Sequence, residues 1–166
     1  MITLTAPRQT DTADIAGVIA GLAKPGDMFV LIGEMGAGKT FFAQQFGKSL
    51  GVSEAITSPT FNLLHNYSGG RLPMHHADLY RLERTGELAD LGIAELVEAG
   101  GVALVEWGDV VGDDIGDGLT ITLSHVEGSE DSRRIEIGWR GLRSKQDFVD
   151  LQQSATPFLV EAASLI

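Results

Sequence analysis

The amino-acid sequence predicts a three-layer α/β domain whose central sheet mixes parallel and antiparallel strands. Two continuous apolar runs, 28–32 and 102–105, are typical of parallel strands that are buried on both faces. Stretches in which apolar residues recur at helical spacing are interleaved with the strand-like runs, as expected when helices cover both faces of a sheet. Two later runs, 119–123 and 134–139, are expected to pair as a hairpin and to add antiparallel strands.

The N-terminal part of the chain alternates strand and helix signals. Residues 2–5 have the alternation of a short strand. A helix is expected to start at Thr10, because Thr and Asp side chains accept hydrogen bonds from the free amides of a first turn. Apolar residues at helical spacing continue it to Leu22. After the strand 28–32 comes a glycine-rich loop, and a second helix is expected over 40–50.

The remaining elements are shorter. Strand-like runs 60–67 and 72–80 flank a glycine turn. Residues 87–99 are expected to form one or two short helices broken near Gly92. The aspartate-rich loop 108–118 lacks the ligand spacing of a calcium-binding loop, so a solvated loop is the better interpretation.

Length and composition fit a single globular domain. The chain has 166 residues, enough for one sizeable core, and we expect a domain over 1–140 followed by a helical extension, 141–166, of unknown role. Cysteine is absent, which excludes disulfides and thiolate metal sites. No apolar run approaches the roughly 20 residues that cross a bilayer, and no secretory signal is visible at the start, so a cytoplasmic location is expected.

The charge balance argues against direct binding to nucleic acid. The net charge is −11, from 23 acidic and 12 basic side chains. Proteins that bind nucleic acid tightly present a basic face, because neutralisation of phosphates by Lys and Arg supplies most of the affinity. Too few cations are present here to build one.

The glycine-rich loop matches the phosphate-binding pattern G-x-x-x-x-G-K-[ST] at every fixed position. Glycines allow a tight turn whose amides point at phosphates, and the helix that follows adds its positive end. Lys39 supplies a charge for the β- and γ-phosphates, and the Thr40 hydroxyl ligates Mg²⁺. A chance match is disfavoured because a buried strand precedes the motif and a helix follows it. The predicted nucleotide-binding residues are Gly33, Glu34, Met35, Gly36, Ala37, Gly38, Lys39, Thr40 and Phe41.

A P-loop also needs a carboxylate at the end of a neighbouring strand to hold Mg²⁺. Glu106, at the end of a buried strand, and Asp78 are the candidates, although either could be an ordinary strand-end carboxylate. Thr60 could contact Mg²⁺ or the γ-phosphate, or could simply open a strand after Pro59. Trp107 fits the core and the nucleotide site equally well.

The adjacent histidines, His75 and His76, look like a metal pair but are not expected to form one. Two neighbouring residues on a strand point to opposite faces of the sheet. No cysteine and no clear third ligand is available, so a catalytic zinc site is not predicted.

Four segments in one order resemble the TsaE family, also called YjeE. They are the P-loop, Ser-Pro-Thr-Phe at 58–61, His-Ala-Asp-Leu-Tyr-Arg-Leu at 76–82, and Val-Glu-Trp at 105–107. The resemblance spans roughly 10–139, and the second and third segments are far more specific than the P-loop. It departs from the usual Gly-Asp-Leu-Gly-Ala-Gly-Lys-Thr at Glu34 and Met35, which are not the glycines that cradle phosphates.

The resemblance implies roles for individual residues. Thr40 and Glu106 would hold Mg²⁺, and Asp78 would belong to the hydrolytic site with Thr60 in a switch-like segment. Residues near the nucleotide would be Trp107, Arg134 and, on the base side, Gln9. Whether Asp78 or Glu106 positions the attacking water stays open.

The resemblance also implies an activity and partners. The family hydrolyses ATP with Mg²⁺ to support formation of threonylcarbamoyladenosine (t6A) on tRNA, acting on a complex of TsaD and TsaB and not on the base itself. Hydrolysis would reset that complex between rounds, slowly alone and faster with the partners, and tRNA would be met only through them. A nucleotide-dependent interaction switch without hydrolysis remains an alternative. A small-molecule kinase is a further one, disfavoured because the arginine-poor stretch 86–131 offers no lid.

Overall fold

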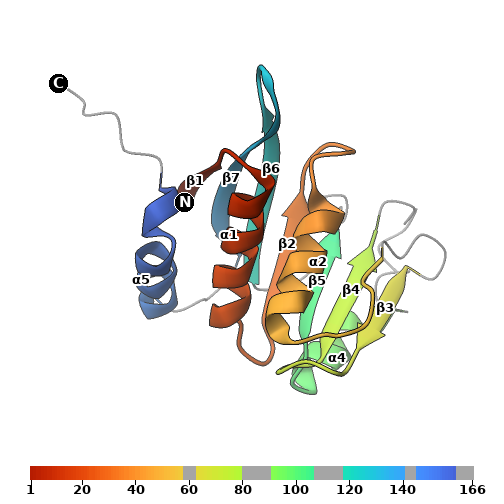
Figure 1. Ribbon diagram of the computed structural model, residues 1–166. Helices are drawn as coiled ribbons and strands as arrows, with labels where there is room; N and C mark the ends of the chain where they lie inside the picture. The colour runs from red at the N-terminus through yellow and green to blue at the C-terminus, as the bar shows by residue number, and fades with distance from the viewer. Residues whose placement is uncertain (58–62, 80–90, 107–117, 141–144, 160–166) are drawn as a thin grey trace.

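The computed structural model describes residues 1–57, 63–79, 91–106, 118–140 and 145–159. Seven strands and a set of helices make up this part of the chain (Figure 1). The strands are β1 (Ile2–Ala6), β2 (Met28–Ile32), β3 (Leu64–Tyr67), β4 (Met74–Asp78), β5 (Val102–Glu106), β6 (Gly118–Val126) and β7 (Ser129–Arg140). The helices are α1 (Gln9–Leu22), α2 (Lys39–Leu50), α4 (Ile93–Glu98), α5 (Lys145–Ser154) and the 3₁₀ turn η3 (Thr156–Phe158).

All seven strands form one mixed sheet in the order β1-β7-β6-β2-β5-β4-β3. The centre is parallel, because β2 pairs in parallel with both β5 and β6, and β4 pairs in parallel with β5. The edges are antiparallel: β1 with β7, β6 with β7, and β3 with β4. The predicted mixture of parallel and antiparallel strands is confirmed.

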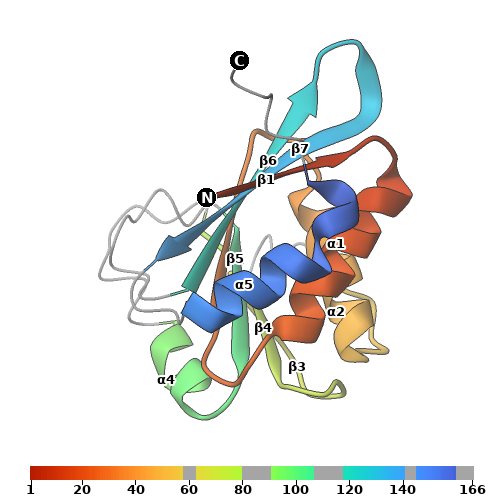
Figure 2. The ribbon, with the colours of Figure 1, turned by 90° about the vertical axis from the view of Figure 1, so that its left-hand side faces the viewer.

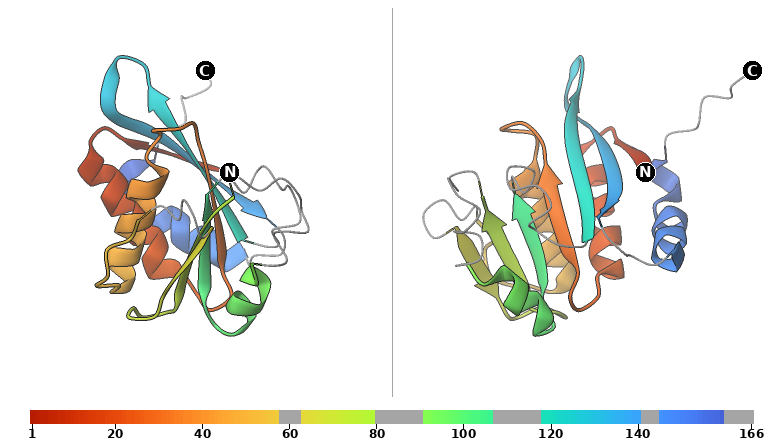
Figure 3. Two further views of the ribbon diagram at one scale, coloured as in Figure 1. Left: turned by 90° about the vertical axis from the view of Figure 1, so that its right-hand side faces the viewer. Right: turned by 180° about the vertical axis from the view of Figure 1, so that it is seen from behind.

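Helices cover both faces of the sheet, which confirms the three-layer prediction. Figure 2 and the left view of Figure 3 show α1, α2 and α5 on one face and α4 on the other. Strand β2 serves both layers, because alternate side chains of a strand point to opposite faces. Phe29 and Leu31 belong to the larger core beneath α1 and α2, whereas Met28 and Val30 belong to the smaller core on the α4 face.

The C-terminal hairpin is longer than the sequence predicted. Strand β6 continues to Val126 and β7 begins at Ser129, so both strands extend beyond the alternating apolar runs from which they were predicted. Figure 1 shows the hairpin tip extending beyond the rest of the sheet, at the same end of the molecule as the loop between β2 and α2. Apart from Val126 and Gly128, the residues of this extension are polar, which is why the hydrophobic pattern did not reveal it.

The chain after β7 packs on the N-terminal part of the fold. Helix α5 lies against α1, and Lys24, just past the end of α1, forms an ion pair with Asp147. Leu159 makes a single antiparallel bridge to Leu4 of β1. Helix α5 and the turn η3 both lie within 141–166, the stretch for which the sequence predicts a helical extension. None of the helices in these described ranges is long and apolar enough to span a membrane.

Candidate nucleotide-binding site

The predicted phosphate loop joins the C-terminal end of β2 to the start of α2. Gly36 and Gly38 have φ angles of 81° and 104°, a left-handed conformation that side chains rarely adopt, so glycine is needed at both turns. The Ala37 amide donates to the Glu34 carbonyl across the turn at 3.0 Å. Helix α2 then begins at Lys39, with Gly38 as its N-cap. Free amides of a first helical turn therefore face the loop, an arrangement suited to anions.

The Lys39 side chain lies inside this loop. It is 6% exposed, and its ammonium donates to the carbonyl oxygen of Gly33 and, at 3.2 Å, to that of Glu34. Met35, at the tip of the loop, is 74% exposed, and Phe41 is half-buried on α2. The loop thus holds a positive charge against two of its own carbonyl groups.

The two predicted carboxylates are neighbours at the ends of adjacent parallel strands. Asp78 ends β4 and is paired in register with Glu106, which ends β5. Glu106 is 2% exposed, and its Oε1 accepts a hydrogen bond from the Thr40 hydroxyl at 3.3 Å. Asp78 is half-buried. Strand β5 also pairs with β2, so the fold brings the carboxylates to the strand that carries the phosphate loop.

These groups fit Mg²⁺ of the kind that P-loops bind. Hydroxyl and carboxylate oxygens are the ligands that Mg²⁺ prefers, and in nucleotide sites it takes only one or two protein ligands beside phosphates and waters. Thr40 and Glu106 supply such a pair in direct contact. No group of three or more His, Asp or Glu side chains with metal-ligand geometry occurs within the described ranges, so these residues form no all-protein metal cage.

His76 completes the carboxylate cluster, and the sequence did not predict its role. Its Nε2 lies 2.9 Å from Glu106 Oε2, and its side chain has no exposed surface. His75 points to the other face of the sheet, as predicted, where its Nδ1 lies 2.7 Å from the Asn66 side-chain oxygen. Burial lowers the pKa of the His75 imidazole. The pair does not form a joint metal site.

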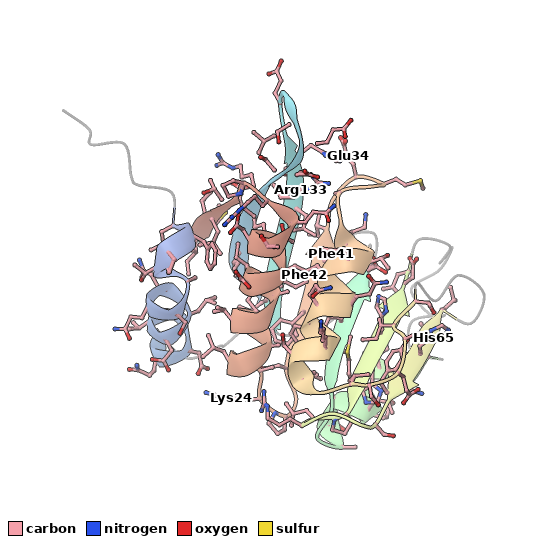
Figure 4. All side chains as sticks on the ribbon, in the orientation of Figure 1. Lys24, Glu34, Phe41, Phe42, His65 and Arg133 are labelled. Atoms are coloured by element: carbon pink, nitrogen blue, oxygen red, sulfur yellow. The ribbon has the colours of Figure 1, made fainter. Side chains whose placement is uncertain are left out.

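An arginine of β7 contacts the phosphate loop, but it is not the predicted one. Arg133 Nε donates to the Ala37 carbonyl at 2.8 Å, and its guanidinium also donates to the Glu130 and Ser132 carbonyls. Arg134 pairs instead with Glu136 at 3.1 Å. Neighbouring residues of a strand point to opposite faces, so only one of the two can reach the loop. Figure 4 shows Arg133 and Glu34 at the same end of the molecule, with Lys24 at the opposite end.

We expect Arg133→Gln to weaken ADP binding about tenfold, because it removes a charge-assisted hydrogen bond that holds the loop, worth about 1.5 kcal/mol. Arg134→Gln is the matched control and should leave the affinity within about twofold. Titration of each variant with ADP by calorimetry measures the difference. A loss of affinity with Arg134→Gln and none with Arg133→Gln would restore the role that the family resemblance gave to Arg134.

A cavity of about 500 Å³ adjoins the loop on the side of β6. Gly33, Glu34 and Ala37 line one wall, and residues 122–125 at the end of β6 line the other. The start of α1 lies near the first residues of β7, because the Ser132 hydroxyl donates to the Pro7 carbonyl at 3.0 Å. Gln9, the first residue of α1, is exposed there.

Gly33 of the loop lies close to the backbone of β6. A Cβ at this position would lie 2.7 Å from the Leu123 carbonyl oxygen and 3.0 Å from Ala37 Cβ. Because the Leu123 carbonyl belongs to backbone that the sheet holds in place, we expect Gly33→Ala to destabilise the fold by about 1–3 kcal/mol. Urea denaturation measures the change. Gly21→Ala in α1, where no atom lies within 4 Å of the new Cβ, should instead be neutral or stabilise by up to about 1 kcal/mol.

Two predicted site residues, Thr60 and Trp107, lie outside the described residues. The same holds for the whole second segment of the family resemblance, 58–61, and for residues 80–82 of the third. Of the rest, the structure brings Lys39, Thr40, Glu106 and Asp78 to one end of the parallel strands. Arg134 and Gln9 are not joined to that group by any hydrogen bond or ion pair described above.

Comparison with known proteins gives the family. The model of the family described as "Threonylcarbamoyl adenosine biosynthesis protein TsaE" matches residues 6–135, well over half of the chain. The chain belongs to the TsaE family. The match includes the phosphate loop, both carboxylates, His76 and Arg133, and it ends inside β7.

Individual relatives agree with the TsaE assignment. The "tRNA threonylcarbamoyladenosine biosynthesis protein TsaE" of Treponema pallidum is 39% identical over 127 residues, which cover 76% of this chain and 93% of that protein. The protein of the same name from Bacillus subtilis is 44% identical over 101 residues, which cover 61% of this chain and 63% of that protein, less than two thirds of its length.

A solved structure supports the fold over nearly the whole chain. The crystal structure of Bacillus subtilis YdiB superposes with a TM-score of 0.77 at 30% sequence identity. The superposition covers 92% of this chain and 97% of YdiB. The α/β architecture of this TsaE family member is therefore shared with an experimentally determined structure.

Proposed function

We propose that this chain is a Mg²⁺-dependent ATPase that hydrolyses ATP to ADP and phosphate in support of t6A formation on tRNA. The observation that carries the proposal is the contact between Thr40, at the start of α2, and Glu106, at the end of β5. It joins a phosphate-binding loop to a buried carboxylate, the two parts that P-loop hydrolysis requires. The family membership supplies the link to t6A.

The residues divide the work of hydrolysis among them. Lys39 and the loop amides bind the phosphates and stabilise the negative charge that develops there. The metal ion, when bound, neutralises charge on the β- and γ-phosphate oxygens, and Thr40 and Glu106 would hold it. Asp78 or Glu106 orients the attacking water, and their adjacent positions in the sheet leave both within the site.

The nucleoside has room on the other side of the loop. The metal-binding side faces β5, so the remaining part of ATP extends toward β6, where the 500 Å³ cavity lies. A volume in this range is that of ordinary small-molecule sites. Arg133 and the start of α1 border the same end of β7, which places positive charge beside the loop.

In this proposal the chain meets tRNA, the substrate of t6A formation, only through partner proteins. Net charge −11 disfavours direct binding to tRNA, so a complex of TsaD and TsaB would hold the tRNA and transfer the threonylcarbamoyl group. Hydrolysis by this chain would reset that complex between rounds. Slow turnover alone and faster turnover with the partners follow from this division of labour.

A multiple-turnover assay of t6A formation tests the role directly. With TsaD and TsaB, excess tRNA and the threonylcarbamoyl donor, we expect about one round per complex without this chain and repeated rounds with the chain and Mg-ATP. Repeated rounds with a non-hydrolysable ATP analogue would favour a nucleotide switch without hydrolysis. Repeated rounds in the absence of the chain would contradict the proposed role.

A further inference from the structure

The buried imidazole of His76 holds one oxygen of Glu106 while Thr40 contacts the other. His76, Asp78 and Glu106 all point to the α2 face of the sheet, because His76 and Asp78 alternate with Ala77, which packs in the core on the α4 face. His76 Nε2 lies 2.9 Å from Oε2, and Thr40 Oγ1 lies 3.3 Å from Oε1. The carboxylate is therefore fixed at both ends.

The burial of this pair makes a purely structural role unfavourable. His76 and Glu106 have side-chain exposures of 0% and 3%. His76 Nδ1 is buried and has no hydrogen-bond partner among the residues that the structure describes. A buried polar atom without a partner costs free energy, so an apolar side chain would suit packing at this position better. The contact with Glu106 is what the imidazole provides that an apolar residue cannot.

We propose that His76 is a positioning residue for the metal carboxylate, an inference that rests on the proposed Mg-nucleotide site. A carboxylate only accepts hydrogen bonds, so Nε2 carries the hydrogen and donates to Oε2. This bond fixes the rotation of the carboxylate and keeps Oε1 beside the Thr40 hydroxyl, where the metal ion would be held. Partners of this kind behind a metal ligand contribute about 10–100-fold to metal affinity in proteins.

Three variants separate positioning from packing. His76→Leu keeps a similar volume and removes the donor. The amide of glutamine reaches the position of Nε2, so His76→Gln retains a donor to Glu106. The shorter asparagine reaches only the position of Nδ1, so His76→Asn does not. His75→Gln, on the opposite face of the sheet, controls for the loss of a buried imidazole from β4.

The experiment measures Mn²⁺ affinity of the ADP complex by electron paramagnetic resonance, with ADP affinity in EDTA as a second readout. We expect His76→Leu and His76→Asn to bind Mn²⁺ about 10–100-fold more weakly, and His76→Gln to stay within a few-fold of wild type. ADP affinity in EDTA should stay within about twofold in all of them, because the phosphate loop is untouched. His75→Gln should match wild type in both measurements.

The outcomes distinguish this inference from the proposed function. If the wild type itself binds neither ADP nor Mn²⁺, the proposed Mg-nucleotide site fails. Thermal denaturation establishes whether His76→Leu is folded. If the wild type binds both ligands and a folded His76→Leu variant binds Mn²⁺ equally well, only the positioning role is overturned. Should His76→Leu fail to fold, equal Mn²⁺ affinity of the Gln and Asn variants overturns it.

Discussion

Lys39→Ala is expected to lower the rate of ATP hydrolysis about 100–1000-fold and to weaken nucleotide binding with and without Mg²⁺. The ammonium lies within the phosphate loop and donates to the loop's own carbonyls at Gly33 and Glu34. In the proposed mechanism it would thus already lie where negative charge develops during phosphoryl transfer. Phosphate release under saturating ATP and ADP titration in EDTA measure the two effects.

Lys48→Ala is the matched control for this change. Lys48 belongs to the same helix but lies in its last turn, exposed to solvent. The substitution removes the same charge from α2 and should leave hydrolysis and ADP affinity within about twofold, because an exposed charge at this distance is screened by salt. Equal losses in both variants would mean that net charge, and not the loop lysine, governs binding.

Glu106→Gln is expected to produce the second large loss, with a different signature. The amide keeps the size of the side chain but removes the negative charge that would hold Mg²⁺ beside Thr40. We expect hydrolysis to fall about 100–1000-fold, comparable to the loss of one transition-state contact, while ADP affinity in EDTA stays within a few-fold of wild type. This result would distinguish the role of Glu106 from that of Lys39, whose loss is expected to weaken nucleotide binding both with and without Mg²⁺.

Metal titration and a surface control complete this test. The Mg²⁺ concentration that gives half-maximal hydrolysis should rise sharply in Glu106→Gln. Glu98→Gln, at the exposed end of α4, should leave it unchanged. Undiminished hydrolysis by Glu106→Gln at wild-type Mg²⁺ concentrations would remove Glu106 from the metal site and leave Asp78 as the carboxylate to examine.

Local patterns predicted the parts of the fold that depend on neighbouring residues. The buried run of β2, the glycine loop and the start of α2 are adjacent in the chain, so the phosphate loop could be recognised without knowing the sheet. Alternation along a strand also separated His75 from His76 correctly. These inferences need only the periodicity of strands and helices.

The contacts that the sequence did not predict depend on how strands distant in the chain pair with each other. His76 meets Glu106 only because β4 and β5 pair in parallel with Asp78 opposite Glu106, a register that no local pattern specifies. The choice between Arg133 and Arg134 likewise depends on how β7 is set against β6, since a shift of one residue would exchange their faces. Thr60 and Trp107 remain predictions, because both lie outside the described residues.

Phosphate release from Mg-ATP by the wild-type chain, measured alone and with TsaD and TsaB, tests the central claim most directly. We predict slow release alone, a clear increase when both partners are added, and no increase when either is left out. Bound nucleotide without phosphate release in the presence of both partners would contradict hydrolysis. Fast release by the isolated chain, unchanged by the partners, would contradict the coupling.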